Sequence, residues 1–219
     1  MIKKGSWLIS NPLPDYSTSC NKDLNGGYGT WDKIGDNLIS KLIARAKKRN
    51  IKLPVLCLGY IQKIIESNNI QCFYTESYNE SLNIIKNKEI QGVVIYGSIV
   101  ACDLENKLIR EIKNLSSAKI IIVGTYPTKF PDQFKEAHHI IIGEPEDFFM
   151  KWNGTLKEIN EKPKIIESVN LVDLDKLPVP KYTKKYSKEF SYRPMLNKPT
   201  GFIEATRGCP YSCGYYCTY

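Results

Sequence analysis

Five short apolar runs recur along the first two thirds of the chain, and we expect each of them to be a β-strand. Three of the runs, GVVIY, KIIIV and HIII, are almost continuous in valine and isoleucine and do not alternate with polar residues. This pattern is typical of strands that are covered on both faces, as in a parallel sheet. The predicted strands are residues 7–10, 71–75, 92–96, 119–123 and 139–142.

Between these runs, apolar residues recur every three or four positions, which predicts amphipathic helices. The clearest stripe is Leu104, Leu108, Ile112 and Leu115. Further helices are predicted around residues 34–46, 57–65, 80–87, 130–137 and 148–152. Strands that alternate with helices predict an α/β fold with a doubly wound parallel sheet, and five strands favour the flavodoxin-like strand order.

Small or polar residues follow four of the predicted strands. In an open parallel sheet, a ligand binds beyond the carboxyl ends of the strands, near the point where the winding direction changes. Each of these residues is also a common turn residue, but four such positions on one edge favour a binding site that a bulky ligand can approach closely. The candidate binding residues are Asn11, Gly97, Ser98, Gly124, Thr125, Gly143 and Glu144.

The alternating pattern ends near Asn153, which divides the chain into three predicted parts. Residues 1–153 form the α/β domain. Residues 154–198 are rich in proline and charge and show no apolar period, so we expect an interdomain linker there. Residues 199–219 begin a second domain, in which a new strand (GFIEA) leads directly into closely spaced cysteines.

The seven cysteines fall into two groups. No secretion signal precedes the domain, so a disulfide framework is not expected. A structural zinc site normally has four ligands, whereas three thiolates suit an iron–sulfur cluster with one open iron. The candidate metal ligands are Cys209, Cys213 and Cys217. The simplest interpretation of the four isolated residues is that they are small buried apolar side chains: Cys20, Cys57, Cys72 and Cys102.

The run TRGCPYSC at residues 206–213 resembles the cluster loop of radical S-adenosylmethionine (SAM) enzymes. The resemblance implies that the three cysteines hold a 4Fe–4S cluster whose open iron binds SAM. It also implies that residues 199–219 are the first strand and loop of a truncated (β/α) barrel. The family spacing is C-x3-C-x2-C, whereas this chain has C-x3-C-x3-C. The family's aromatic residue beside the SAM adenine corresponds to Tyr216.

The upstream part resembles the cobalamin-binding domain that precedes the barrel in many of these enzymes. The tracts that carry the resemblance are GTYP at 124–127, IIIGEPE at 140–146 and DLDKLPVP at 173–180. Ser98 matches a serine that often approaches the buried nucleotide tail. No histidine precedes His138, so the cobalt-ligating D-x-H-x-x-G motif is absent, and the resemblance implies cobalamin bound without a protein imidazole.

Together these resemblances imply the N-terminal part of a cobalamin-dependent radical SAM enzyme. The implied activity is methyl transfer to an unactivated carbon or phosphorus centre of a small-molecule substrate, with an external electron donor such as flavodoxin or ferredoxin. We assign no catalytic residue and expect this fragment alone to be inactive. Two alternatives stay open: a non-catalytic Rossmann-like module for a nucleotide or a vestigial cobalamin site, and a zinc or redox knuckle in an interaction protein.

The formal net charge of +8 does not change this interpretation. The lysines are scattered, and no basic block is interleaved with aromatic residues, so solvated helix faces explain the charge and nucleic acid is not an expected partner. The sequence holds no apolar run long enough to span a membrane. Without a signal peptide at the N-terminus, we expect a cytoplasmic protein.

Overall fold

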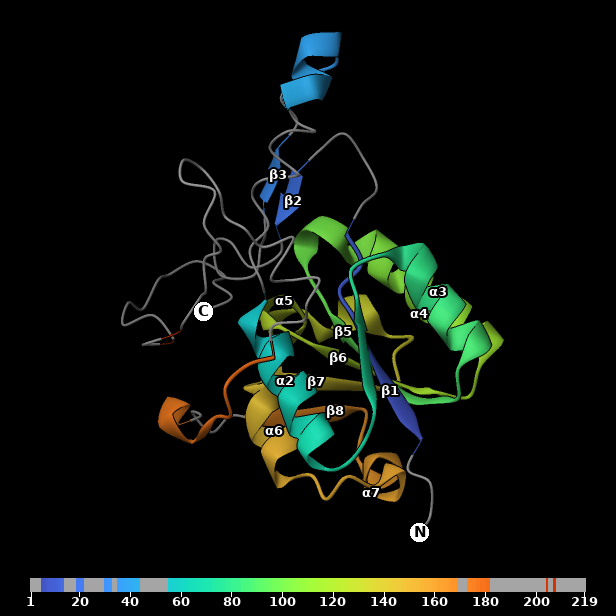
Figure 1. The fold of residues 1–219 in the computed structure, drawn as a ribbon, viewed down its shortest axis with the longest axis vertical. Coiled ribbons are helices and arrows are strands. Elements are labelled where there is room, and N and C mark those ends of the chain that lie inside the picture. Colours follow the sequence, from blue (N-terminus) through green and yellow to red (C-terminus); the bar gives the residue numbers. More distant parts are fainter. Residues whose placement is uncertain are drawn as a thin grey trace.

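The computed structural model describes residues 5–13, 19–21, 30–32, 35–43, 55–168 and 173–181, together with Glu204 and Arg207. Six parallel strands form the central sheet in the order β4-β1-β5-β6-β7-β8 (Figure 1). The strands are β1 (Ser6–Ser10), β4 (Cys72–Thr75), β5 (Ile90–Tyr96), β6 (Lys119–Val123), β7 (His139–Gly143) and β8 (Ile165–Ser168). The α/β class is therefore confirmed.

The predicted number of five strands is one too few. The strands β4, β1, β5, β6 and β7 follow the flavodoxin-like order, and β8 extends the sheet beyond β7, with Ile140 opposite Ile165 and Gly143 opposite Ser168. Helix α7 (Leu156–Glu161) and β8 both fall within the range that the sequence assigns to the linker. Alternating exposure along this short edge strand explains why it lacks the continuous apolar run of the buried strands.

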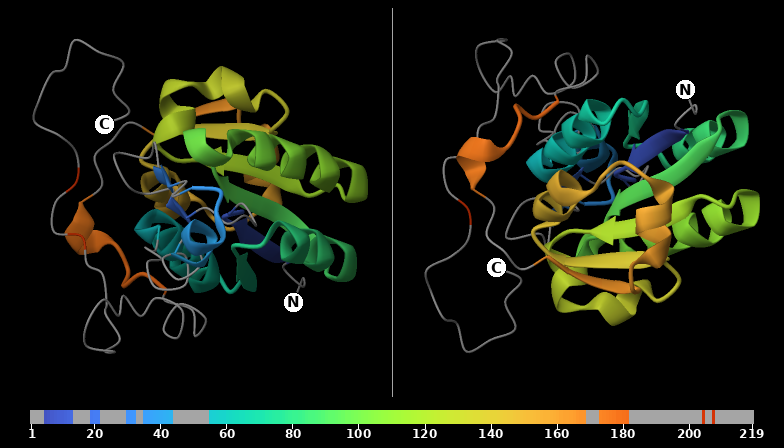
Figure 2. Two further views of the ribbon diagram at one scale, coloured as in Figure 1. Left: turned by 90° about the horizontal axis from the view of Figure 1, so that it is seen from above. Right: turned by 90° about the horizontal axis from the view of Figure 1, so that it is seen from below.

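Helices cover both faces of the sheet (Figure 2). Helices α2 (Leu56–Ser67), α6 (Pro145–Lys151) and α7 pack on one face, and α3 (Tyr78–Asn87) and α4 (Cys102–Leu115) pack on the other. Consecutive strand residues enter opposite cores, because side chains alternate along a strand: Ile9 packs with α2 and α6, whereas Leu8 packs with α3 and α4.

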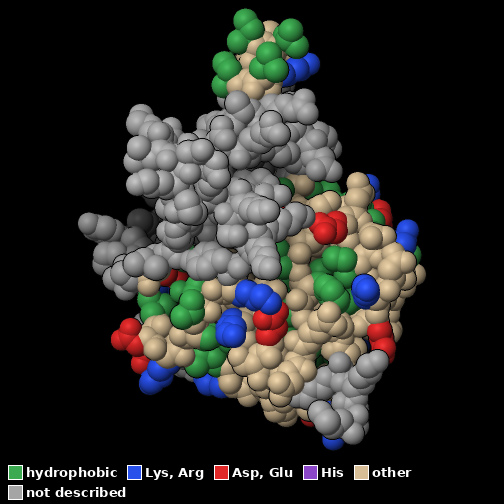
Figure 3. Space-filling model, in the orientation of Figure 1, with side chains coloured by type: hydrophobic (Ala, Val, Ile, Leu, Met, Phe, Trp, Pro, Cys, Tyr) green, Lys and Arg blue, Asp and Glu red, His purple; other side chains and the backbone are tan. Residues whose placement is uncertain are grey.

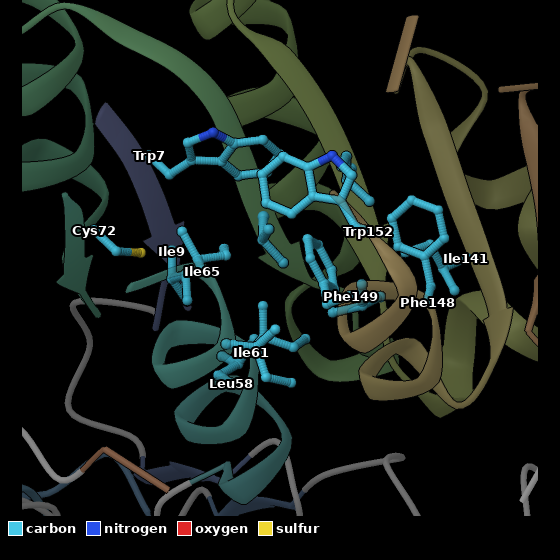
Figure 4. Close-up of a cluster of buried hydrophobic side chains, with 14 of the residues drawn as sticks. Trp7, Ile9, Leu58, Ile61, Ile65, Cys72, Ile141, Phe148, Phe149 and Trp152 are labelled. Atoms are coloured by element: carbon cyan, nitrogen blue, oxygen red, sulfur yellow. The ribbon is translucent and has the colours of Figure 1, made fainter. Parts of the chain in front are cut away.

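An aromatic cluster occupies the core beneath α2 and α6 (Figure 4). The ring centroids of Trp7 and Trp152 lie 4.8 Å apart, and those of Trp7 and Phe149 lie 6.2 Å apart. Trp7 and Phe149 are almost fully buried. The indole Nε1 of Trp152 donates to the carbonyl oxygen of Thr155 at 2.9 Å, which satisfies the polar end of this ring and ties α6 to the start of α7.

The remaining described elements are short. Helix α5 (Thr125–Lys129) follows β6. The short 3-10 helices are η1 (Ile99–Ala101), η2 (Pro131–Phe134) and η3 (Leu174–Lys176). Strands β2 (Ser19–Asn21) and β3 (Thr30–Asp32) form an antiparallel pair that lies beyond the carboxyl ends of the sheet strands in Figure 1. None of the described helices is long and apolar enough to cross a membrane.

Residues 38–43 are helical, within the predicted helix at 34–46. Their apolar stripe does not pack against the described core, since Leu38 is 75% exposed and Ile39 is 69% exposed. Figure 3 shows hydrophobic side chains at the surface of this segment, at the top of the view. The apolar period therefore predicted the helix correctly but did not predict its contacts.

Candidate functional site

The candidate binding residues lie at the carboxyl ends of four neighbouring strands. Asn11 follows β1, Gly97 follows β5, Gly124 follows β6, and Gly143 ends β7. Because β1, β5, β6 and β7 are consecutive and parallel, these positions share one edge of the sheet, which we call the carboxyl edge. The winding direction reverses between β1 and β5, which is where ligands of flavodoxin-like domains bind.

Two glycines of this edge are required by the packing of the chain itself. A Cβ atom on Gly97 would lie 2.5 Å from Cγ of Pro127 and 2.9 Å from Cζ of Phe134. Gly124 has a φ of +122°, and its Cβ would lie 3.0 Å from the carbonyl oxygen of Gly97. Glycine at these two positions is thus explained without a ligand.

Ser98 is fully buried and is bound to a carboxylate that the sequence analysis missed. Its backbone N–H donates to Oε2 of Glu105, and its hydroxyl donates to Oε1, both at 2.9 Å. Glu105 has no exposed surface, so these charge-assisted bonds stabilise a buried carboxylate in the first turn of α4. The hydroxyl proton of Ser98 is therefore committed to Glu105 and is not available for a ligand.

The side chain of Asn11 is the exception at this edge. Asn11 is only 3% exposed, and its Oδ1 atom has no hydrogen-bond partner within the described part of the chain. Its backbone N–H donates to the carbonyl oxygen of Thr75 at 2.9 Å. A buried acceptor without a donor costs about 1–3 kcal/mol, so Asn11 is the residue here whose chemistry favours a bound donor group.

Thr128 of α5 joins the ends of β6 and β7. Its hydroxyl donates to the carbonyl oxygen of Gly124 at 2.8 Å and accepts the backbone N–H of Gly143 at 3.1 Å. Gly143 has a φ of +93°, a conformation that favours glycine. Thr125 is the first residue of α5. The backbone of this edge is consequently held in a fixed shape by contacts between neighbouring loops.

Arg207, which belongs to the predicted cluster motif, reaches the carboxyl edge. Its guanidinium forms ion pairs with Glu144, with Glu146 at 3.1 Å and with Glu204 at 2.6 Å. Glu144 precedes α6, and Glu146 lies in its first turn. The structure thus gives the carboxylate of Glu144, a predicted ligand-binding residue, a partner within the chain.

Burial governs the electrostatics of this ion-pair cluster. Arg207 is 22% exposed at its side chain, whereas Glu146 is 0% exposed. Burial raises the pKa of Glu146 above its ordinary value, although the charge of Arg207 opposes the shift. Burial lowers the pKa of Arg207, but its hydrogen bonds and charge interactions with the three carboxylates outweigh this effect and raise it. The guanidinium therefore remains charged throughout the working pH range.

The predicted metal ligands Cys209, Cys213 and Cys217, and Tyr216 beside them, lie outside the described residues. Among the residues that are described, no group of three or more His, Cys, Asp or Glu side chains could hold a metal ion. Cys72 is buried, as predicted, and Cys57 and Cys102 are half-buried.

Both histidines are engaged away from the carboxyl edge. Nδ1 of His138 accepts the backbone N–H of Ile120 at 3.0 Å, and Nδ1 of His139 lies 3.0 Å from the carbonyl oxygen of Pro163. His139 begins β7, at the opposite end of this strand from Gly143. The imidazoles are consequently not positioned to bind a ligand at the candidate site.

No protein-family model matches the chain, and no curated protein matches it.

Proposed function

We propose that this chain is the N-terminal part of a cobalamin-dependent radical SAM enzyme, of methyltransferase type. In this proposal the carboxyl edge holds cobalamin, and Cys209, Cys213 and Cys217 hold a 4Fe–4S cluster. The observation that carries the proposal is the contact of Arg207 with Glu144 and Glu146 at the carboxyl edge. Arg207 precedes Cys209 by two residues, so this contact supports a cysteine motif beside the predicted corrin site.

The described residues fit a cobalamin site in part. The Oδ1 atom of Asn11 lacks a donor among them, and the amide groups on the rim of a corrin supply N–H donors. Ser98 does not fit the predicted contact with the nucleotide tail as a donor, because its hydroxyl proton is bound to Glu105. Contacts with the ligand are thus assigned to the Asn11 amide and to the backbone of the carboxyl edge.

The cofactors would supply the chemistry, and the protein would position and shield them. A reduced cluster with bound SAM would supply a 5′-deoxyadenosyl radical, methylcobalamin would supply the methyl group, and an external flavodoxin or ferredoxin would supply the electron. The role of this chain is to hold both groups beside a small-molecule substrate. Glu144 and Glu146 contribute by fixing Arg207 rather than by touching the substrate.

The cluster is tested by anaerobic reconstitution with iron and sulfide. The wild-type chain should bind about four iron and four sulfide per chain, with the broad visible absorption of such clusters. A variant with all three motif cysteines replaced by alanine should bind neither. Replacement of Cys57 and Cys102, which lie in the α/β domain, is the matched control and should leave iron binding unchanged. A wild-type chain without iron would refute the cluster.

The corrin site is tested by gel filtration after incubation with hydroxocobalamin. The wild-type chain should elute with a corrin spectrum. Asn11→Ala should lower the affinity about tenfold, the effect of losing one hydrogen bond. Asn87→Ala, on an exposed part of α3, is the control.

A non-catalytic Rossmann-like module is the second candidate. The internal bonding of Ser98 and the packing around Gly97 favour it, because both features are complete without a ligand. A protein that stays colourless with hydroxocobalamin and holds no iron would favour this alternative.

A further inference from the structure

We infer that Arg207 is a positioning residue that clamps the cysteine motif to the carboxyl edge through Glu144 and Glu146. The contact joins residues more than sixty positions apart: the guanidinium donates to Glu146 at 3.1 Å and also to Glu144. Its consequence for a metal cluster rests on the proposed function, whereas the clamp itself can be tested in the metal-free protein.

The burial of Glu146 makes this contact specific. Glu146 has no exposed surface, and its Oε2 atom has no hydrogen-bond partner among the described residues. Its Oε1 atom pairs with Arg207, which supplies the cation for this buried carboxylate. Removal of one partner from a buried pair leaves an uncompensated charge. Glu204 binds two guanidinium nitrogens of Arg207, at 3.2 and 2.6 Å. The carboxylate of Glu204 thereby orients the planar guanidinium toward α6. Lysine has no second nitrogen and cannot form this two-point contact.

A second anchor lies where the chain leaves the α/β domain. The backbone N–H of Lys181 donates to the carbonyl oxygen of Gly59 in α2 at 3.1 Å, and its ammonium pairs with Glu66 of the same helix. A Cβ atom on Gly59 would lie 3.1 Å from Cβ of Pro180. The absence of a side chain at Gly59 therefore lets the segment at Pro180 pack closely against α2. Helices α2 and α6 pack against each other. The chain is consequently fixed to the same helical layer both at Lys181 and at Arg207.

The two anchors have different roles in this arrangement. Lys181 fixes the chain at α2, and Arg207 fixes the chain two residues before the first motif cysteine. Loss of Lys181 leaves Arg207 and its carboxylates in place. Loss of Arg207 removes the described contact between the carboxyl edge and the part of the chain that carries the motif cysteines.

The first test measures hydrogen–deuterium exchange of the metal-free chain. Arg207→Gln should raise amide exchange in peptides that contain Glu204 and Arg207 by about 10-fold to 100-fold, and at 1.4 kcal/mol per tenfold change this corresponds to about 1.4–2.8 kcal/mol. Arg207→Lys should have a smaller effect. Arg110→Gln is the matched control, because Arg110 pairs with Glu136 at 3.3 Å on an exposed surface. Exchange in Arg207→Gln within about twofold of wild type would overturn the clamp.

A double variant separates positioning from stability. Arg207→Gln leaves Glu146 buried without its cation, whereas the additional change Glu146→Gln removes that charge. The double variant should recover the melting temperature of the α/β domain, yet exchange in peptides that contain Glu204 and Arg207 should stay fast. Slow, wild-type exchange in the double variant would show that Arg207 acts only on stability and would refute a positioning role.

The second test uses the reconstituted chain. The electron paramagnetic resonance spectrum of the reduced wild-type cluster should change through magnetic coupling when cob(II)alamin is added, and Arg207→Gln should retain iron but lose this response. A retained response would refute the positioning role while leaving the proposed function intact. If the wild-type chain binds no iron, the proposed function fails, and the exchange experiment alone decides the clamp.

Discussion

Gly92→Ala should destabilise the domain by overfilling the aromatic core. Gly92 lies opposite Trp7 in the pairing of β5 with β1. A Cβ atom at this position would lie 2.6 Å from both Cε2 and Cζ2 of Trp7, whereas two carbon atoms pack best at about 3.5–4.0 Å. The indole would therefore have to move by about 1 Å.

The surroundings of Trp7 oppose that movement. Trp7 is 2% exposed, and the rings of Trp152 and Phe149 pack against it. Overpacking of this kind costs about 1–3 kcal/mol, and the replacement of a strand glycine by alanine returns about 0.5–1 kcal/mol. We expect a net loss of about 1–2 kcal/mol, which lowers the melting temperature of a domain of this size by about 2–8 °C.

The assay is a double-mutant cycle with Trp7→Leu, measured by urea unfolding. Leucine removes the ring atoms that the new methyl group would strike. In the Trp7→Leu background, Gly92→Ala should therefore be neutral or stabilising by about 0.5–1 kcal/mol, with a coupling energy of at least about 1 kcal/mol. An equal loss in both backgrounds would refute the argument from Trp7.

Three further results are expected. Gly124→Ala should cost about 1–3 kcal/mol in urea unfolding, because its φ of +122° is strained for alanine; an unchanged midpoint would contradict this. Burial raises the pKa of Cys102 to about 11, so peptide mapping at pH 8 should show alkylation about 100-fold slower than that of a thiol with the ordinary value of 9. Burial, followed by Lys119, lowers the pKa of His138 below 6.5. The unfolded chain then binds more protons below pH 6.5, so stability should be full above this pH and fall on acidification. His138→Asn should flatten this part of the stability–pH curve. An unaltered slope would show that His138 is not the group responsible.

The sequence predicted those parts of the fold that burial makes regular. The strands around Val94, Ile121 and Ile141 are buried on both faces, so their apolar runs are continuous. The prediction that Asn11 and Gly143 share one edge followed from the parallel sheet, because parallel strands end on the same side of a sheet. The stripe at 38–43 also predicted a helix, but periodicity along one segment carries no information about what that segment contacts.

The missed features depend on contacts between distant residues or on weak local patterns. Strand β8 has only four residues, and Ile165 is 43% exposed while Ile166 is buried. The bond between Ser98 and Glu105 crosses the turn into α4. The ion pairs of Arg207 join segments more than sixty residues apart, and no spacing rule connects such positions.

The place of β1 in the sheet has a consequence for how the chain folds. Trp7 is synthesised well before its strand partners Cys72 and Gly92, which lie more than sixty residues further along the chain. The apolar strand must therefore wait on the ribosome without its neighbours, and such non-local pairing slows folding. An unpaired strand edge of this kind exposes the nascent chain to aggregation, so β1 is where a holding chaperone would be of most use.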